Sequence, residues 1–242
     1  MTTPMLCKRA FFICAVPRSG STLLCDLLQA TGVAGSPMEY GVQENEQIWK
    51  HAYGFNDHRN YFIHYAHRLS VTGNGVFSAK LMFKQMTAFV SDLKRYKSID
   101  AGGMIETIDL AFGKPRYIQV LRKDKERQAI SLVRAEQTGS WASPQSSGRR
   151  SEYDSAHLDR ALALLLRLDN AWDESLAEIH LSRKMTLYYE DIVENMEGSI
   201  SSLLNWLQIE DHPKPFKSPS MKRQSDAMTE EWLAMWRKHG RL

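Results

Sequence analysis

The segment PRSGST at residues 17–22 combines residue types that suit anion binding, and it lies between an apolar run and a helical pattern. A loop that joins a buried strand to a helix N-terminus directs successive backbone N–H groups at one point, where the helix dipole adds partial positive charge. Gly20 allows a close approach of the backbone to an anion, and Arg18 adds a full positive charge. Hydroxyl donors come from Ser19, Ser21 and Thr22. The pattern predicts a cradle for phosphate or sulfate, with a serine-rich turn that only caps the helix as the alternative.

The loop differs from that of nucleotide triphosphatases. The GxxxxGK[ST] pattern places a Lys on the phosphates, whereas here Arg18 stands before the glycine. No predicted strand ends in apolar residues followed by an Asp that would hold magnesium, and Glu190 and Asp191 come nearest. A cradle without the magnesium-binding residues suits transfer of a sulfuryl group better than transfer of a γ-phosphoryl group.

A second set of polar residues follows a later apolar run. Arg122 comes directly after the run at 117–121, and ligands of open parallel sheets bind at the carboxyl ends of strands. The helix predicted after it carries one polar stripe opposite an apolar side. The stripe consists of Arg127, Ser131, Arg134 and Thr138. It is either a second part of the anion site or a solvated face.

Residues 16–40, VPRSGSTLLCDLLQATGVAGSPMEY, resemble the opening of the bacterial trehalose sulfotransferase family, whose hallmark is RSGSTLL followed by ATGVAGxPxE. Weaker similarities follow at 76–85 (VFSAKLMFKQ), 122–141 (RKDKERQAISLVRAEQTGSW), 189–191 (YED) and 223–226 (RQSD). The resemblance implies transfer of a sulfuryl group from 3′-phosphoadenosine 5′-phosphosulfate (PAPS) to a hydroxyl of a carbohydrate or glycolipid, without a metal. It is also compatible with a homodimer.

The resemblance assigns roles to particular residues. It implies that the 5′-phosphosulfate binds to Arg18, Ser19, Gly20, Ser21 and Thr22. It implies that Arg122 and Ser131 bind the 3′-phosphate, and that Arg223 belongs to the donor site. Arg122 and Ser131 are nine positions apart, one more than in the cytosolic sulfotransferases.

The acceptor hydroxyl must lose a proton, which calls for a general base. Glu39, in the loop after the first helix, is the base that the resemblance implies. A histidine is the alternative, from the group His51, His58, His64 and His67. Arg18 and the loop amides are expected to stabilise the charge that develops on the leaving group, and Lys80 could reach the same group.

Four strands and intervening helices must position these residues. Short apolar runs predict strands at 11–16, 76–83, 117–121 and 185–189, and helical spacing predicts helices at 22–30, 124–138, 157–179 and 229–238. Alternation of strands and helices predicts a P-loop-like α/β fold of three layers, with a central parallel sheet flanked by helices. We expect one domain over 1–242, with a mobile loop at 138–151 and a proline-rich connector at 210–220.

Charge and composition narrow the function classes. The 242 residues carry a net charge of +3, but 114–150 hold nine Lys/Arg against three acidic residues and 212–242 hold seven against three. Such concentrated positive charge suits an anionic ligand. The mean hydropathy is −0.40, and no apolar run approaches the ~18 residues of a spanning helix. The short apolar run near the N-terminus does not resemble a secretory signal, and the three cysteines lack metal spacing, so we expect reduced core thiols in the cytoplasm and no stable membrane insertion.

Two other function classes stay open. A P-loop-like kinase for small molecules or nucleotides would use the same loop. A non-catalytic module that binds anions or nucleic acid would use the basic segments, but these lack the interleaved aromatics of a nucleic-acid motif, and we expect no nucleic-acid partner.

Overall fold

The computed structural model describes residues 7–40, 67–141, 150–210 and 227–238. At its centre lies a parallel sheet whose strands follow the order β2-β1-β3-β4. The strands are β1 (Arg9–Ala15), β2 (Val76–Met82), β3 (Arg116–Leu121) and β4 (Lys184–Tyr188). All four predicted strands are confirmed, with boundaries that differ by at most two residues.

After the exposed Arg9, the inner strand β1 is apolar and buried from Ala10 to Ala15, as is typical of strands in parallel sheets covered on both sides. Phe11 and Ile13 pack into the core on one face, and Phe12 and Cys14 pack into the core on the other. The alternation follows from the two-residue repeat of a strand.

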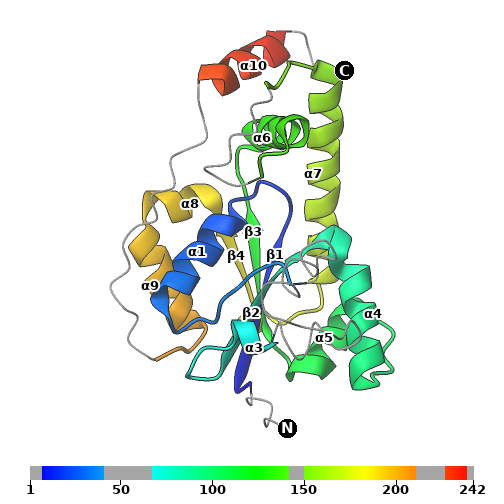
Figure 1. Cartoon of the computed structure of the whole chain (residues 1–242), viewed down its shortest axis with the longest axis vertical. Coiled ribbons are helices and arrows are strands. Elements are labelled where there is room, and N and C mark those ends of the chain that lie inside the picture. The colour runs from blue at the N-terminus through cyan, green and yellow to red at the C-terminus, as the bar shows by residue number, and fades with distance from the viewer. Residues whose placement is uncertain (1–6, 41–66, 142–149, 211–226, 239–242) are drawn as a thin grey trace.

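Helices cover both faces of the sheet and give three layers (Figure 1). On the face that Phe11 and Ile13 line, the covering helices are α1 (Ser21–Thr31), α8 (Tyr189–Glu194) and α9 (Met196–Trp206). On the opposite face they are α4 (Met86–Lys97), α5 (Met104–Phe112) and α7 (Ser155–Ser175). The short helix α3 (His67–Ser70) and two 3₁₀ turns, Phe83–Gln85 and Leu181–Arg183, complete the connections. This architecture confirms the predicted α/β class.

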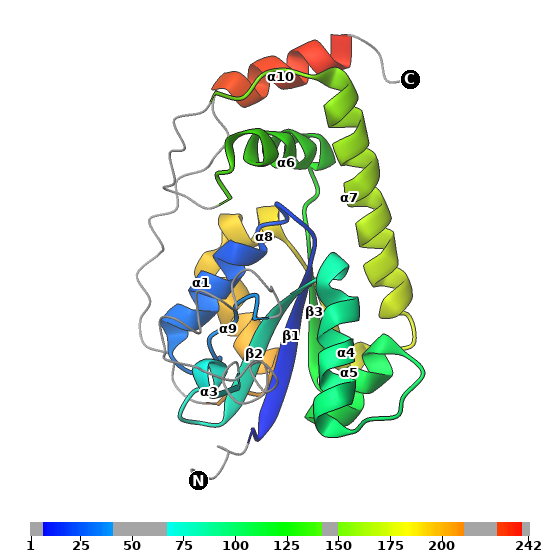
Figure 2. The same cartoon turned by 45° about the vertical axis from the view of Figure 1, so that its right-hand side comes forward.

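Two further helices lie beyond the carboxyl edge of the sheet (Figure 2). Helix α6 (Lys125–Thr138) starts just after β3, with the Asp124 side chain accepting from the Arg127 N–H as its N-cap. Helix α10 (Ala227–Lys238) packs across α6, so that α6 lies between α10 and the ends of the strands. No helix in these four described stretches is both long and apolar enough to cross a membrane.

The structure corrects the predicted helix over 157–179. Helix α7 begins at Ser155, where Asp154 caps it, and ends at Ser175. Leu176 and Ile179 continue the apolar stripe and remain buried in the core, but they do so from a turn. The apolar spacing therefore persisted beyond the point where the helix ends.

The segments predicted to be irregular lie largely outside the described residues. Thr138 is the last residue of α6, and the loop predicted at 138–151 is described only at its two ends. Of the connector at 210–220, only Glu210 is described. The thiols of Cys14 and Cys25 are buried and free, as predicted for core cysteines, and Cys7 is half-buried.

Candidate active site

The loop between β1 and α1 has an unusual backbone conformation. Arg18 has φ of 62° and Gly20 has φ of 88°, both in the left-handed region. Gly20 also packs against the ring of Tyr189, and a Cβ built on Gly20 would lie 2.3 Å from the Tyr189 Cδ2 atom. The glycine is thus required by its backbone angle and by the proximity of Tyr189.

The Arg18 side chain joins the loop to helix α6. Its Nε donates to the Ser131 hydroxyl at 2.8 Å, and one terminal nitrogen donates to the Trp141 carbonyl at 2.6 Å. The two sets of residues that the sequence assigned to an anion site therefore lie at the same edge of the sheet. Ser131 thus contacts Arg18 of the loop, and its assignment to the 3′-phosphate stays a prediction.

Arg122 lies next to the same loop. A terminal nitrogen is 3.5 Å from the Arg18 carbonyl, and the guanidinium lies 5.1 Å from the centroid of the Tyr189 ring. Among the described residues, the buried Arg122 Nε and the buried Ser19 hydroxyl have no hydrogen-bond partner. Since buried polar groups are normally satisfied, each of these two donors leaves a hydrogen bond that an acceptor from a ligand could complete.

Positive charge accumulates at this edge. Burial, together with the charges of Arg122 and Arg134, lowers the pKa of Arg18 below its ordinary value. Such mutual repulsion favours a bound anion, which would lie between the guanidinium groups. The arrangement suits a ligand with more than one negative group.

Glu39 belongs to a second cluster beside the same helix N-terminus. Lys80, almost completely buried on β2, places its Nζ 2.8 Å from a Glu39 carboxylate oxygen and 3.2 Å from the Thr22 hydroxyl. The other Glu39 oxygen accepts from the Gln85 amide at 3.1 Å. A backbone hydrogen bond also links β2 to the loop that carries Glu39, because the Lys80 N–H donates to the Met38 carbonyl at 3.0 Å.

This cluster connects the predicted base to the predicted phosphate loop through Lys80. Burial acts to lower the pKa of Lys80, but the acidic groups of Cys25, Glu39 and Asp26 outweigh burial and raise it. Lys80 is therefore charged at neutral pH. Its place between Thr22 and Glu39 brings a cation near both the start of α1 and the candidate base.

In the structure, the residues of the predicted polar stripe of α6 have three kinds of partner. Arg127 binds Asp124 and Glu230, and one Arg134 nitrogen donates to the Thr229 hydroxyl at 2.8 Å. Much of the stripe therefore faces α10, because that helix covers this side of α6. Thr138 hydrogen-bonds to its own helix, at the Arg134 carbonyl, and Ser131 contacts Arg18.

The acidic residues that came nearest to a magnesium-binding pattern have structural partners. One Glu190 oxygen accepts from the Lys123 N–H at 2.9 Å, and the other accepts from the Asp124 N–H at 3.2 Å. Asp191 pairs with the Lys123 side chain. Glu190 thus fixes the turn that carries Arg122.

Sequence reasoning assigned no role to the Tyr189 side chain. The ring of Tyr189 lies against Gly20 and under Arg122, so it shapes the site from the α8 side. Its position directly after the fourth strand was a usable signal, because that is the carboxyl edge at which ligands bind.

Other predicted site residues fall outside the described ranges. Arg223, His51, His58 and His64 lie there, and His67 is the first residue of α3. Ser21 is buried at the start of α1, and Thr22 is exposed beside it.

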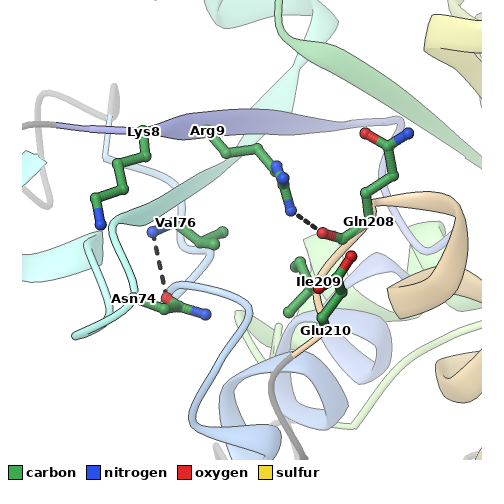
Figure 3. A pocket seen from close by; sticks show the side chains of 7 residues that line it. All are labelled: Lys8, Arg9, Asn74, Val76, Gln208, Ile209 and Glu210. Carbon is green, nitrogen blue, oxygen red and sulfur yellow. Dashed lines mark hydrogen bonds between the residues drawn. The ribbon is translucent and has the colours of Figure 1, made fainter.

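A separate cavity of about 300 Å³ lies near the amino ends of β1 and β2, the opposite edge from the loop (Figure 3). Arg9 projects across it to the Gln208 carbonyl, which lies just after the C-terminus of α9, while Asn74 accepts from the Val76 N–H. A cation near the C-terminal end of a helix is stabilised by the helix dipole. None of the predicted site residues lines this cavity.

Comparisons with known proteins identify the family and the fold. A trehalose 2-sulfotransferase of Mycolicibacterium smegmatis is 26% identical over 260 residues, with 95% of this chain and 94% of that protein covered. A trehalose 2-sulfotransferase of Mycobacterium tuberculosis is 25% identical over 257 residues, with the same coverage. The fold is similar to that of the sulfotransferase STF9 from Mycobacterium avium, with a TM-score of 0.50 and 14% identity, over 96% of this chain and 68% of that one. The model of the Stf0 sulphotransferase family matches residues 10–239, and the chain therefore belongs to that family of sulfotransferases.

Proposed function

We propose that the protein transfers the sulfuryl group of PAPS to a hydroxyl group of a carbohydrate or glycolipid acceptor. The observation that carries the proposal is the convergence of Arg18, Arg122 and Ser131 on one edge of the sheet, where a buried guanidinium nitrogen lacks a partner among the described residues. PAPS carries two anionic groups, and the site offers two groups of donors. The residues present fit this donor.

In the proposed donor complex, the loop amides with Gly20, Ser21 and Thr22 bind the 5′-phosphosulfate. Arg122 and Ser131 bind the 3′-phosphate, and Ser19 and Arg223 complete the donor contacts. Arg18, which contacts Ser131 in this structure, lies between the two groups and stabilises the charge that develops on the leaving phosphate oxygen. The leaving product is adenosine 3′,5′-bisphosphate.

Glu39 is the proposed general base. It takes the proton of the acceptor hydroxyl while the acceptor oxygen forms a bond to sulfur and the sulfur–oxygen bond to the phosphate breaks. Lys80, 2.8 Å from the carboxylate, holds Glu39 beside the loop. A metal ion is not part of the proposed reaction, because guanidinium and ammonium groups provide the positive charge.

The two curated relatives are named for sulfation of trehalose, which supports a sugar as the acceptor. The loop that carries Glu39 is closed by the Tyr40 hydroxyl, which donates to the Ser36 carbonyl at 2.5 Å. We further propose that the chain acts as one sulfotransferase domain in the cytoplasm, with a homodimer as the assembly to test by sedimentation.

Radiolabelled PAPS tests the proposal. The protein is incubated with the labelled donor and trehalose, other sugars or a glycolipid extract, with and without EDTA. We expect a labelled acceptor and stoichiometric adenosine 3′,5′-bisphosphate, both unaffected by EDTA. Transfer of phosphate from ATP that EDTA abolishes would instead establish the kinase alternative.

A further inference from the structure

The left-handed conformation of Arg18 is held from both sides. Residues other than glycine adopt positive φ at a cost of roughly 1 kcal/mol or more, so the contacts around Arg18 must favour this conformation. The Pro17 carbonyl, just before Arg18, accepts from the Gln128 side-chain amide at 2.8 Å. The Arg18 carbonyl, just after it, lies 3.5 Å from the Arg122 guanidinium.

Gln128 is completely buried on α6, and its orientation is fixed in turn. The Lys125 ammonium lies 3.3 Å from the Gln128 amide oxygen and forms an ion pair with Asp169 on α7. An ammonium group can only donate, so it selects the amide orientation in which the oxygen faces Lys125 and the NH₂ faces Pro17. Asp169, Lys125 and Gln128 therefore form a connected chain that ends at the loop.

The effect of this chain on the loop follows from peptide geometry. A peptide unit is planar and trans, so the direction of the Pro17 carbonyl sets the opposite direction of the Arg18 N–H. The neighbouring carbonyls are also held, since Trp172 Nε1 donates to Ala15 at 3.0 Å and the Ser19 N–H lies 3.4 Å from the Val16 carbonyl. Because the Pro17 carbonyl is directed at Gln128, the Arg18 N–H of the same peptide unit points away from Gln128.

We infer that Gln128 is a positioning residue of the donor site, which acts through the Pro17–Arg18 peptide and is itself oriented by Lys125 and Asp169. The inference rests on the proposed function, because it assigns this loop to the donor. It concerns residues that lie outside the loop and that need not touch the donor.

The test is Gln128→Met, which keeps the length of the side chain and removes its donors. We expect the Kd for adenosine 3′,5′-bisphosphate and the KM for PAPS to rise about tenfold, the factor that corresponds to ~1.4 kcal/mol. The KM for the acceptor should stay within twofold of the wild type. Without any ligand, hydrogen exchange of the amides at residues 18–22 should become faster, which is a readout that needs no turnover.

Gln119→Met is the matched control. Gln119 is also buried, and its amide donates to Asp173 on α7 at 2.7 Å, so within the described part of the chain its side chain is bonded to α7 and not to the loop. This variant should leave the nucleotide Kd and the loop exchange unchanged. Equal weakening by both variants would show general loosening of the core and would overturn the inference.

Lys125→Met is a second test of the inference. The Lys125 side chain is 24% exposed, and the substitution keeps Gln128 but removes the ammonium group that orients its amide. We expect weakened nucleotide binding in the same direction, and a double variant no worse than Gln128→Met. If the wild type binds the nucleotide and both variants bind it equally well, the inference fails and the proposed function stands. If the wild type does not bind it, the proposed function fails and the inference with it.

Discussion

The Arg18 guanidinium and the Ser131 hydroxyl lie 2.8 Å apart, although they are separated by 113 positions in the chain. The contact joins the loop after β1 to the helix after β3, across two adjacent strands of the sheet. The contact also leaves Arg18 close to Arg122 and Arg134. Burial lowers the pKa of Arg18, and the charges of these two arginines lower it further. An anion bound at this edge of the sheet would reduce the repulsion among these arginines.

Arg18→Ala should abolish turnover and weaken binding of adenosine 3′,5′-bisphosphate, because the variant loses the charge that lies between the two proposed phosphate sites. Binding is measured by calorimetry or by thermal stabilisation, for which a hundredfold excess of ligand over Kd gives roughly 2.7 kcal/mol in the wild type. Arg95→Ala removes the same charge from an exposed position on α4 and should behave as the wild type. Wild-type turnover in Arg18→Ala would remove Arg18 from the site.

Gly20→Ala should lose donor binding, since the new Cβ would lie 2.3 Å from the Tyr189 ring at a φ of 88°. The loop or the ring must move, and either movement disturbs the contacts of Arg122. Gly32→Ala separates this effect from backbone strain. Gly32 also has positive φ, but nothing lies within 4 Å of its added Cβ, so this variant should lose roughly 1 kcal/mol of stability and keep its nucleotide affinity. Equal affinities in the two variants would refute the argument.

Glu39→Gln should reduce the rate by roughly 10²–10⁴ while nucleotide binding stays within twofold of the wild type. The amide oxygen of Gln can still accept from Lys80, which keeps this contact, while the variant loses the negative charge and with it the capacity to take a proton. Single-turnover rates with saturating donor measure the chemical step. Glu174→Gln, at an exposed position on α7, is the control, and an unaltered rate in Glu39→Gln would place the base elsewhere.

Asp124→Asn should remove a part of the stability that depends on pH. Burial acts to raise the pKa of Asp124, but the backbone N–H and the guanidinium of Arg127, with Arg122, outweigh it and lower the pKa below 3.8. A carboxyl group whose pKa is lower in the folded state stabilises the fold above the unfolded pKa, and this contribution is lost as the pH falls through the folded value. Asn still caps α6 through its amide oxygen, so the variant loses the negative charge and the hydrogen bond from the Arg127 guanidinium but keeps the cap.

Urea unfolding near neutral pH and at about pH 3 measures this effect. We expect Asp124→Asn to be less stable by roughly 0.5–1 kcal/mol near neutral pH, because the pair with Arg127 is partly exposed, and to approach the wild type in acid. Asp92→Asn, in an exposed pair with Arg95, should show a smaller difference. A difference for Asp124→Asn that does not change with pH would contradict the electrostatic explanation.

The sequence by itself determined the four strands of the sheet and the loop after the first strand. It also showed that Arg18 and Arg122 follow the carboxyl ends of two strands. A parallel strand buried on both faces requires a continuous apolar run, and such runs are visible without coordinates. The carboxyl ends of those runs then indicate the edge at which ligands bind. The family was also recognisable from residues 16–40, and the family match at residues 10–239 agrees with it.

Only the tertiary structure decided which side chains meet. Periodicity defines the faces of α6, but it does not reveal that α10 covers one of them. Residues of α10 bond to Arg127 and Arg134 of the polar stripe. The ion pair of Glu39 and Lys80 and the contact of Gly20 with Tyr189 likewise depend on how separate elements approach each other. The physical reason is that spacing along a helix or strand is a local property, whereas the partner of a side chain is set by the packing of elements distant in the chain.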